Sequence, residues 1–232
     1  MRILRFFRFH ARFGQGAPDP AALDACAQRA NYLMALSRER IADELLKLLA
    51  LPDPSPTLAL MVDRHILVPV LPEIVADAAP RIAALVRAES AAAVAPEPLR
   101  RLAAILPRDP TVAAKVAARL KLSKKARKRL TAAADPVLDR NPRALAYRLG
   151  TDSAVDGLLL ADRSVDAAAM ADWLIPRLPL GGGDLVARGV PVGPEVALRL
   201  RAIEAAWVAA DFPTGPASDA LVDSNLAQDK AR

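Results

Sequence analysis

The first fourteen residues, MRILRFFRFHARFG, combine cations and aromatic rings at a spacing that suits phosphate chemistry. Arginine recurs at every third or fourth position, and on a helix of 100° per residue the four guanidinium groups fall within a sector of about 120°. Guanidinium groups bind phosphate oxygens bidentately and stack on bases, so a helix that faces RNA is one interpretation. The four residues are Arg2, Arg5, Arg8 and Arg12.

Three other interpretations of this segment stay open from the residues alone. Its amphipathic pattern is also typical of a helix that lies on a membrane surface. Its arginines and its lack of acids fit an organelle-targeting peptide, although such peptides are rich in serine and this one has none. In the plainest interpretation it is a packed helix whose arginines pair with acids of the same protein. The phenylalanines of this segment are expected to pack on the helices that follow.

A second group of cations lies in KLSKKARKR (121–129), which holds six lysines and arginines in nine residues. Residues 1–130 contain 22 Lys and Arg against 12 Asp and Glu, a net charge of +10, whereas residues 131–232 have a net charge of −4. This asymmetry favours a polyanion as the partner of the front part, although such a run is more often only a solvated surface. The candidate phosphate contacts are Lys121, Lys124, Lys125 and Lys128.

One stretch, PLGGGDLVARGVPVGPE (179–195), is rich in glycine. It lacks the G-x-x-x-x-G-K-[ST] spacing of a phosphate-binding loop, and no β-rich segment precedes it. Gly193 and Pro194 instead mark the start of a long helix over 194–212. Free N–H groups at that helix start could hold an RNA phosphate, or the chain simply turns there.

The sequence offers no set of residues with the spacing of a catalytic centre. It has no Asp-x-Asp pair of the kind that two-metal nucleotidyl transfer requires, and its two histidines, His10 and His65, lack ligand spacing. Cys26 is the single cysteine, which excludes a disulfide within the chain and favours a reducing, cytoplasmic setting. By itself the chain does not have the features of an enzyme.

The elements that position these residues are predicted to be helices. Alanine and leucine are abundant, aromatic residues make up 4%, and twenty prolines divide the chain into many short helices. The longest apolar runs fall well short of the roughly 18 residues of a membrane span. The prediction is an all-α fold with helices over 2–13, 19–30, 37–51, 79–93, 97–106, 110–134 with a hinge at 122–123, 141–150, 152–163, 165–177 and 194–212. Residues 57–74 are predicted to form a short helix, a turn near His65 and an apolar segment.

The helix over 37–51 is the best-defined element of this prediction. An i,i+4 ion pair between Arg40 and Glu44 is expected on its surface. Its core stripe is formed by Ile41, Leu45, Leu48 and Leu49.

Four stretches, in this order, resemble the bacterial class II tRNA nucleotidyltransferases, which comprise CCA-adding enzymes and related poly(A) polymerases. RILRFFRFHARFG (2–14) is similar to the Arg-x-x-Arg-x-x-Arg-Phe helix that ends the family's base-selecting motif, and ERIADELLKLL (39–49) resembles its neck segment. MVDRHIL…LPEI (61–74) resembles the segment that ends in Leu-Pro-Glu. GGDLVARGVPVGPEVALRLRAIE (182–204) is similar to the tail motif. His65 and Ala197 depart from the family, which usually has glycine at these positions.

The resemblance implies an all-α, multi-helical RNA-binding region of the kind found toward the C-terminus of these enzymes. It implies a neck at 1–51, a body at 52–134, a tail at 135–212 and a polar extension at 213–232. The body and tail would grip the acceptor and TψC arm of tRNA. In the neck, Arg2 matches the base-selecting arginine, and Arg5 and Arg8 match the basic positions beside it, so all three are expected to bind the nucleotide. RNA contacts are expected at Arg12, Lys121, Lys124, Lys125, Lys128, Gly193 and Arg199.

In the family a catalytic head precedes these regions, with a glycine-rich nucleotide motif, a metal-binding Asp-x-Asp and a Glu-Asp pair that helps select CTP or ATP. The head would lie before Met1, so we expect a truncation, a misassigned start codon or one half of a split enzyme. This chain is then expected to hold no cofactor and to be inactive alone, and Mg²⁺ with CTP or ATP is expected only in the complete enzyme. The expected partners are tRNA and a catalytic head that is missing or separately encoded, with no membrane. The alternative is a stand-alone helical scaffold that binds RNA or docks a separate catalytic subunit.

Overall fold

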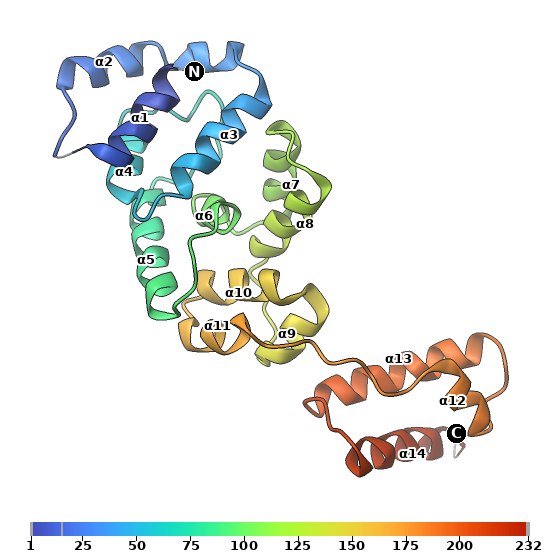
Figure 1. Cartoon of the computed structure of the whole chain (residues 1–232). Helices are drawn as coiled ribbons and strands as arrows, with labels where there is room; N and C mark the ends of the chain where they lie inside the picture. Colours follow the sequence, from blue (N-terminus) through green and yellow to red (C-terminus); the bar gives the residue numbers. More distant parts are fainter. Residues whose placement is uncertain (1, 15, 231–232) are drawn as a thin grey trace. The chain divides into compact units, whose positions relative to one another are not determined.

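The computed structural model describes residues 2–14 and 16–230, and within these residues the chain consists of helices joined by turns and loops, without a strand. Figure 1 shows the fourteen α-helices of this part of the chain, which also contains one short 3-10 helix. The predicted all-α fold is confirmed.

The helices are short, as the frequent prolines predict. Most of them span between seven and sixteen residues. In the first part of the chain they are α1 (Arg2–Phe13), α2 (Pro20–Gln28), the 3-10 helix η1 (Ala30–Ala35), α3 (Arg38–Leu49), α4 (Ser55–Asp63), α5 (Ala78–Ala91), α6 (Pro98–Ala104), α7 (Pro110–Arg119) and α8 (Lys124–Ala133). In the second part they are α9 (Pro142–Leu149), α10 (Thr151–Leu160), α11 (Ser164–Ala171), α12 (Gly182–Ala187), α13 (Pro194–Ala209) and α14 (Pro216–Lys230).

The chain folds as two compact units. The first unit comprises Met1–Leu138 and Asp152–Asp172, and the second comprises Asp139–Thr151 and Trp173–Arg232. The four regions expected from the sequence stay a prediction.

Side-chain caps set the starts of several helices that begin with proline. The carboxylate of Asp19 accepts from the Ala22 amide at 3.0 Å, and that of Asp109 accepts from the Thr111 amide at 2.6 Å. Each cap satisfies an N–H group that has no partner inside its helix and contributes about 1 kcal/mol of stability. The expected pair of helices over 110–134 is also confirmed, with its hinge at the cap of α8.

His65 is the left-handed residue of the turn that ends α4, with a φ of 54°. The amide of His65 donates to the carbonyl of Val62 at 3.0 Å, and the amide of Ile66 donates to that of Met61 at 2.9 Å. These two bonds define a Schellman turn, in which the left-handed position favours glycine. Glycine would fit this position without strain, and His65 makes the turn at a steric cost.

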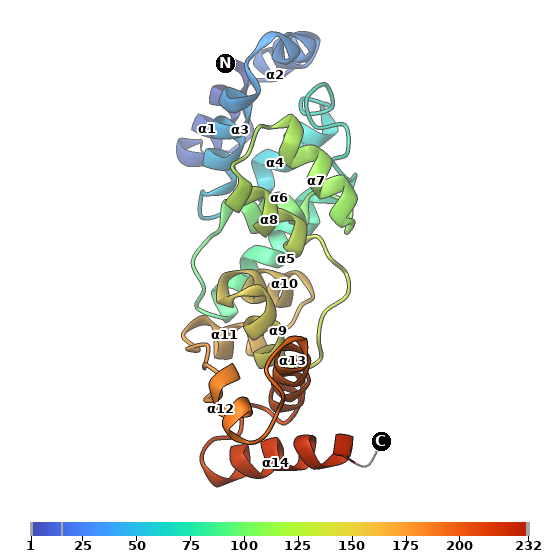
Figure 2. The ribbon, with the colours of Figure 1, turned by 90° about the vertical axis from the view of Figure 1, so that its right-hand side faces the viewer.

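In the first unit, α1 packs against α3 and α4 and contributes Leu4 and Phe7 to the core. Figure 2 shows α1 and α3 next to each other near the N-terminus. The predicted packing of the phenylalanines is wrong for Phe9 and Phe13, whose exposed fractions are 44% and 65%. The helical rotation places these two rings in the arginine sector, on the side away from α3 and α4.

The expected core stripe of α3 is confirmed, because its four apolar residues are all buried. The expected pair between Arg40 and Glu44 is not found among the described residues. Glu44 instead accepts from the Nε of Arg8 at 2.8 Å. Glu44 is buried against α1, where a partner from another helix is within reach, and Arg40 is exposed.

A charged cluster lies inside the first unit, between α5, α6 and α10. The guanidinium of Arg101 donates to Glu89 at 2.6 and 3.0 Å and to the carbonyl of Leu49 at 2.8 Å. The Nε of Arg100 lies 3.2 Å from Glu89 and 3.6 Å from Asp156. The two buried arginines are thus paired with two buried carboxylates, and Arg129 of α8 joins the cluster through its hydrogen bonds to Asp156. Removal of any one of them would leave an unpaired charge in the core, which is strongly destabilising.

The second unit is built on α13, which packs against α9, α12 and α14. One apolar cluster contains Leu185, Ile203 and Val222, and another is centred on Trp207. The indole Nε1 of Trp207 donates to the carbonyl of Pro213 at 2.7 Å, which satisfies its one polar group. The polar segment after residue 212, whose order the sequence left open, contains α14.

Among residues 2–14 and 16–230, none of the helices combines the length and the apolar character needed to cross a bilayer.

Candidate RNA-binding surface

The first two turns of α8 carry four exposed cations, which we call the α8 basic face. Ser123 caps the helix by accepting from the Ala126 amide at 3.2 Å, so the cations begin directly at the helix start. Within the described part of the chain, none of the four makes an ion pair. They are Lys124, Lys125, Arg127 and Lys128.

This arrangement works against the stability of α8. Positive charges in the first turn oppose the helix macrodipole, and acids are the favoured residues there. Lys124 also lies at i,i+3 and i,i+4 from Arg127 and Lys128, where like charges repel by a few tenths of a kcal/mol. The first turn of α8 contains no acidic residue. A bound polyanion would offset both the unfavourable interaction with the helix dipole and the repulsion between the like charges.

A groove of about 470 Å³ lies along this face, between α7 and α8. Lys124, Arg127 and Lys128 line it from α8, while Pro110 and Ala114 form the opposite, uncharged wall. Figure 2 shows that α7 and α8 lie side by side as an antiparallel pair. With Asp135 as its one carboxylate, the groove therefore offers three cations to an anion that can approach from solvent.

The other two cations of KLSKKARKR are engaged elsewhere. Lys121 donates to Glu39 at 2.8 Å, and this bond lowers the pKa of that carboxyl. Arg129 is half-buried and donates to Asp156 at 2.6 and 3.0 Å. Its hydrogen bond to Asp156 raises the pKa of Arg129. Lys121 is thus held at the surface by an acid, and Arg129 belongs to the charged cluster of the core.

The arginines of α1 differ in their surroundings. Arg2 and Arg5 are exposed, and neither makes an ion pair with another described residue. Arg8 is half-buried on Glu44, and its guanidinium carbon also lies 4.9 Å from the ring centre of Phe9. Arg5 approaches the same ring at 5.8 Å. The plain interpretation, pairing with an acid of the same protein, therefore holds for Arg8.

Arg12 is exposed at the end of α1 and lies 5.3 Å from the ring centre of Phe13. Cations over aromatic faces attract the ring and keep their N–H groups available to a ligand. The exposed surface of α1 therefore alternates arginines with exposed rings, which is the combination that stacks on bases and binds phosphates.

The remaining candidates lie in the second unit. Gly193 is exposed and adopts a φ of 135° at the N-cap of α13, a conformation that requires glycine. Arg199 is paired with Glu195 at 2.7 Å, one turn earlier on the same helix. Neither residue belongs to the unit that carries the α8 basic face.

Sequence reasoning missed Arg127 as a site residue, although it lies inside the basic run. Its spacing of three from Lys124 places both side chains in the same groove, and this helical periodicity is the signal that could have identified it. The tertiary contacts of Lys121 and Arg129 had no comparable signal, because their partners are far away in sequence.

Metal binding is not supported by the described residues, among which no group of three or more His, Cys, Asp or Glu side chains is placed to hold a metal ion. The Mg²⁺ that the family resemblance implies for the complete enzyme thus finds no fitting set of ligands here. The surfaces of α1 and α8 are instead suited to bind anions.

Comparison with known proteins gives a match to a family model and a match to a solved structure. Residues 17–77 match the family model described as "Probable RNA and SrmB-binding site of polymerase A". The fold is similar to a solved structure entitled "The complex structure of CCA-adding enzyme with ATP", with a TM-score of 0.66 and 16% sequence identity. A comparison with curated proteins found no match.

The structural match covers 98% of this chain and 60% of the CCA-adding enzyme. The chain therefore corresponds to somewhat more than half of the length of that enzyme, and the shared part is helical throughout the described residues. At this level of identity the match shows a common fold. Residues 17–77 are thus similar to a model of an RNA-binding site of polymerase A, and the described residues share the helical fold of part of a CCA-adding enzyme.

Proposed function

We propose that this chain is the RNA-binding part of a cytoplasmic tRNA nucleotidyltransferase and that it holds tRNA by its acceptor and TψC arm during CCA addition. Phosphates of the RNA bind on the α8 basic face, at Lys124, Lys125 and Lys128. The tail residues Gly193 and Arg199 contribute further contacts, and the chain itself carries out no chemical step.

The observation that carries the proposal is the state of the α8 basic face. Four exposed cations occupy the first two turns of one helix, with no acidic residue in its first turn and at a cost to that helix. RNA supplies a row of phosphates for such a surface, and its binding releases counterions. The family match over 17–77, to a model described as an RNA-binding site, supports the same partner.

We propose that α1 faces the incoming nucleotide. Arg2 and Arg5 are exposed and available for its base or its phosphates, whereas Arg8 fixes the helix through Glu44. Catalysis would need a head that supplies the metal ligands, on the same protein or on a separately encoded one.

A second candidate function is a scaffold that docks such a catalytic subunit through α1. The exposed rings of Phe9 and Phe13, with centres 6.0 Å apart, favour this function, because exposed aromatic side chains are common at protein interfaces. Both functions use the same helix, and they differ in whether this chain binds RNA when it is alone.

The deciding experiment measures the affinity of the full chain for a tRNA transcript over a series of salt concentrations. We expect strong binding at low salt and a linear fall of log K with log[salt]. The double variant K124Q/K128Q is expected to reduce this slope by about 1.4–1.8, since each lost phosphate contact removes about 0.7–0.9.

The matched control is the double variant K47Q/K115Q, which removes the same charge from exposed lysines of α3 and α7. Its slope is expected to stay within a few tenths of that of the wild-type chain. Equal losses in the two double variants would refute a specific role for the α8 basic face. Absence of tRNA binding at low salt would refute RNA binding and leave the scaffold.

A further inference from the structure

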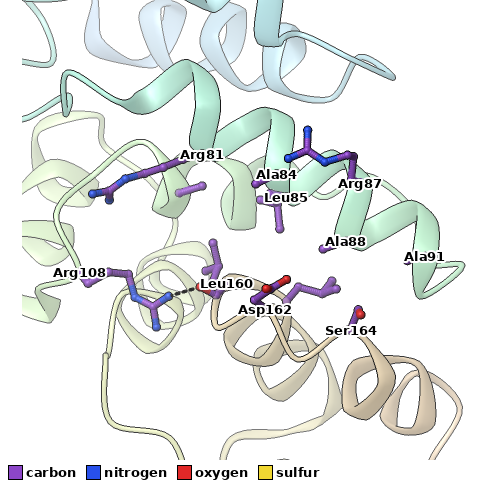
Figure 3. Close-up of a pocket in the computed structure, with 12 residues that line it drawn as sticks. Arg81, Ala84, Leu85, Arg87, Ala88, Ala91, Arg108, Leu160, Asp162 and Ser164 are labelled. Atoms are coloured by element: carbon purple, nitrogen blue, oxygen red, sulfur yellow. Dashed lines mark hydrogen bonds between the residues drawn. The ribbon is translucent and has the colours of Figure 1, made fainter.

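A cavity of about 730 Å³ lies inside the first unit, between α5 on one side and the end of α10 and start of α11 on the other. Figure 3 shows Ala84 and Leu85 on α5 opposite Asp162, while the side chain of Arg81 extends toward the end of the cavity where Arg108 lies. The volume is within the range of about 300–1,000 Å³ that is typical of sites for small ligands.

Arg108 lies at one end of the cavity and is held in a fixed orientation. Its two terminal nitrogens donate to the carbonyls of Leu160 and Asp135, at 2.9 and 2.8 Å. Both acceptors are neutral, so the contacts orient the guanidinium without neutralising it. The Nε of Arg108 is buried and has no hydrogen-bond partner within the described structure.

The guanidinium of Arg108 is partly buried, and it has charged neighbours of both signs. Burial lowers the pKa of Arg108, the nearby carboxylate of Asp135 raises it, and the charge of Arg81 lowers it again. Arg81 belongs to the same cavity, and its NH1 also donates to the carbonyl of Leu106 at 3.4 Å. Two arginines therefore share this end. Arg81 is paired with Asp77 at 2.9 Å, whereas Arg108 makes no ion pair with a described residue, and a buried arginine usually has a carboxylate as its partner.

Two other residues of the cavity lining are charged. Arg87 is exposed on the same helix and lines the cavity without an ion pair to any described residue. Asp162 is the one carboxylate among the lining residues, on the opposite wall. The lining thus has three cations and one anion.

Apart from Ser164, the other lining residues are apolar. Leu85 and Leu159 form the walls of the cavity, and Ala84, Ala88 and Ala91 leave the facing side of α5 free of bulky side chains. A ligand that fits both parts has an anionic group at one end and a flat or apolar body at the other.

We propose that this cavity binds a nucleotide, with its phosphate on Arg108 and Arg81 and its nucleoside against Leu85 and Leu159. Phosphate is the anion that the geometry favours, because two guanidinium groups at one end match a group with several acceptor oxygens. The phosphate can come from a free nucleotide or from one nucleotide of a bound RNA. The inference does not rest on RNA binding by α8.

The test measures two affinities of the full chain, one for AMP by calorimetry and one for a tRNA transcript at constant salt. Arg81→Gln removes a cavity cation at little cost to folding, because its i,i+4 pair with Asp77 is exposed. Ala84→Leu fills the cavity from an exposed helix position and keeps a good helix former there. Each substitution is expected to weaken binding at least tenfold in one arm or in both.

The matched control is Arg64→Gln, which likewise removes an arginine paired with an aspartate, Asp24, but lies outside the cavity. It is expected to leave the AMP affinity unchanged, as is K124Q/K128Q. A loss in the AMP arm alone identifies a free nucleotide as the ligand, and a loss that includes the RNA arm identifies a nucleotide of bound RNA.

The proposal is overturned if neither arm responds to Arg81→Gln and Ala84→Leu, which includes the case in which the wild-type chain binds neither AMP nor tRNA. Failure of the proposed RNA-binding surface gives a different result, in which the tRNA affinity does not depend on Lys124 and Lys128.

Discussion

The Nε of Arg8 donates to Oε2 of Glu44 at 2.8 Å and joins α1 to α3 across 36 positions of the sequence. The two side chains are 18% and 6% exposed, so this ion pair is largely shielded from water. One arginine of the stripe on α1 therefore anchors the helix, and Arg2, Arg5 and Arg12 are exposed.

We expect Glu44→Gln to lower the free energy of unfolding by about 1–3 kcal/mol, because it weakens a hydrogen bond to a charged group and leaves Arg8 with a neutral partner. The measurement is urea denaturation followed by circular dichroism. The control is Lys47→Gln, which breaks the exposed pair with Asp43 and is expected to change the stability by no more than about 0.5 kcal/mol. An equal effect of both substitutions would show that α1 is not anchored by Arg8.

His65→Gly is expected to be neutral or stabilising by up to about 1 kcal/mol. It removes the steric cost of a side chain at positive φ, about 1–2 kcal/mol. Glycine also raises the conformational entropy of the unfolded chain, which offsets part of this gain in stability. His65 is exposed, so no packing is lost. Thermal unfolding measures the change, and a clear loss of stability would mean that the imidazole makes a contact that the turn geometry does not require.

Lys121 should contribute less to RNA binding than Lys128, because Lys121 is paired with Glu39. The substitution Glu39→Gln releases Lys121 and removes a negative charge, so we expect tRNA affinity to rise and its salt dependence to steepen. The substitution Lys121→Gln should reverse this gain in the double variant. If Glu39→Gln weakens tRNA binding instead, Glu39 itself contributes to RNA binding, and its proposed role of neutralising Lys121 is wrong.

Stability of the second unit should depend on pH in the alkaline range through Tyr147. Burial and a hydrogen bond to Glu204, at 2.5 Å, raise the pKa of Tyr147 to about 12. Since the ordinary value is about 10, the contribution is complete below that pH and is lost as pH rises through about 12. We expect Tyr147→Phe to remove this part of the pH dependence of thermal unfolding. Tyr32→Phe is the control, because Tyr32 is 70% exposed.

The pure chain should not extend tRNA when supplied with CTP, ATP and Mg²⁺. The sequence has no Asp-x-Asp pair, and the described residues bring no three metal-ligating side chains together. Incorporation of labelled nucleotide into tRNA measures this directly. Incorporation by pure protein would show that the chain contains a catalytic centre that neither its sequence nor its fold reveals.

The sequence alone determined the class of the fold and most helix positions, because these depend on contacts within a few residues. Proline at the first turn with Asp109 before it marks α7, and the apolar period of 37–51 marks α3. Ser123 and the hinge before it separate α7 from α8 in the same way. Segments without such signals were less clear, and the polar stretch that forms α14 is the main example.

The sequence also located the two basic clusters, but only the tertiary structure decided which of their cations are available. Lys121 and Glu39 are 82 positions apart, and Arg129 and Asp156 are 27 apart. The cavity at Arg108 likewise needs α5 and α10 to meet. Such contacts follow from how helices pack, which no local pattern of residue types specifies, whereas helix formation and capping are set by neighbours along the chain.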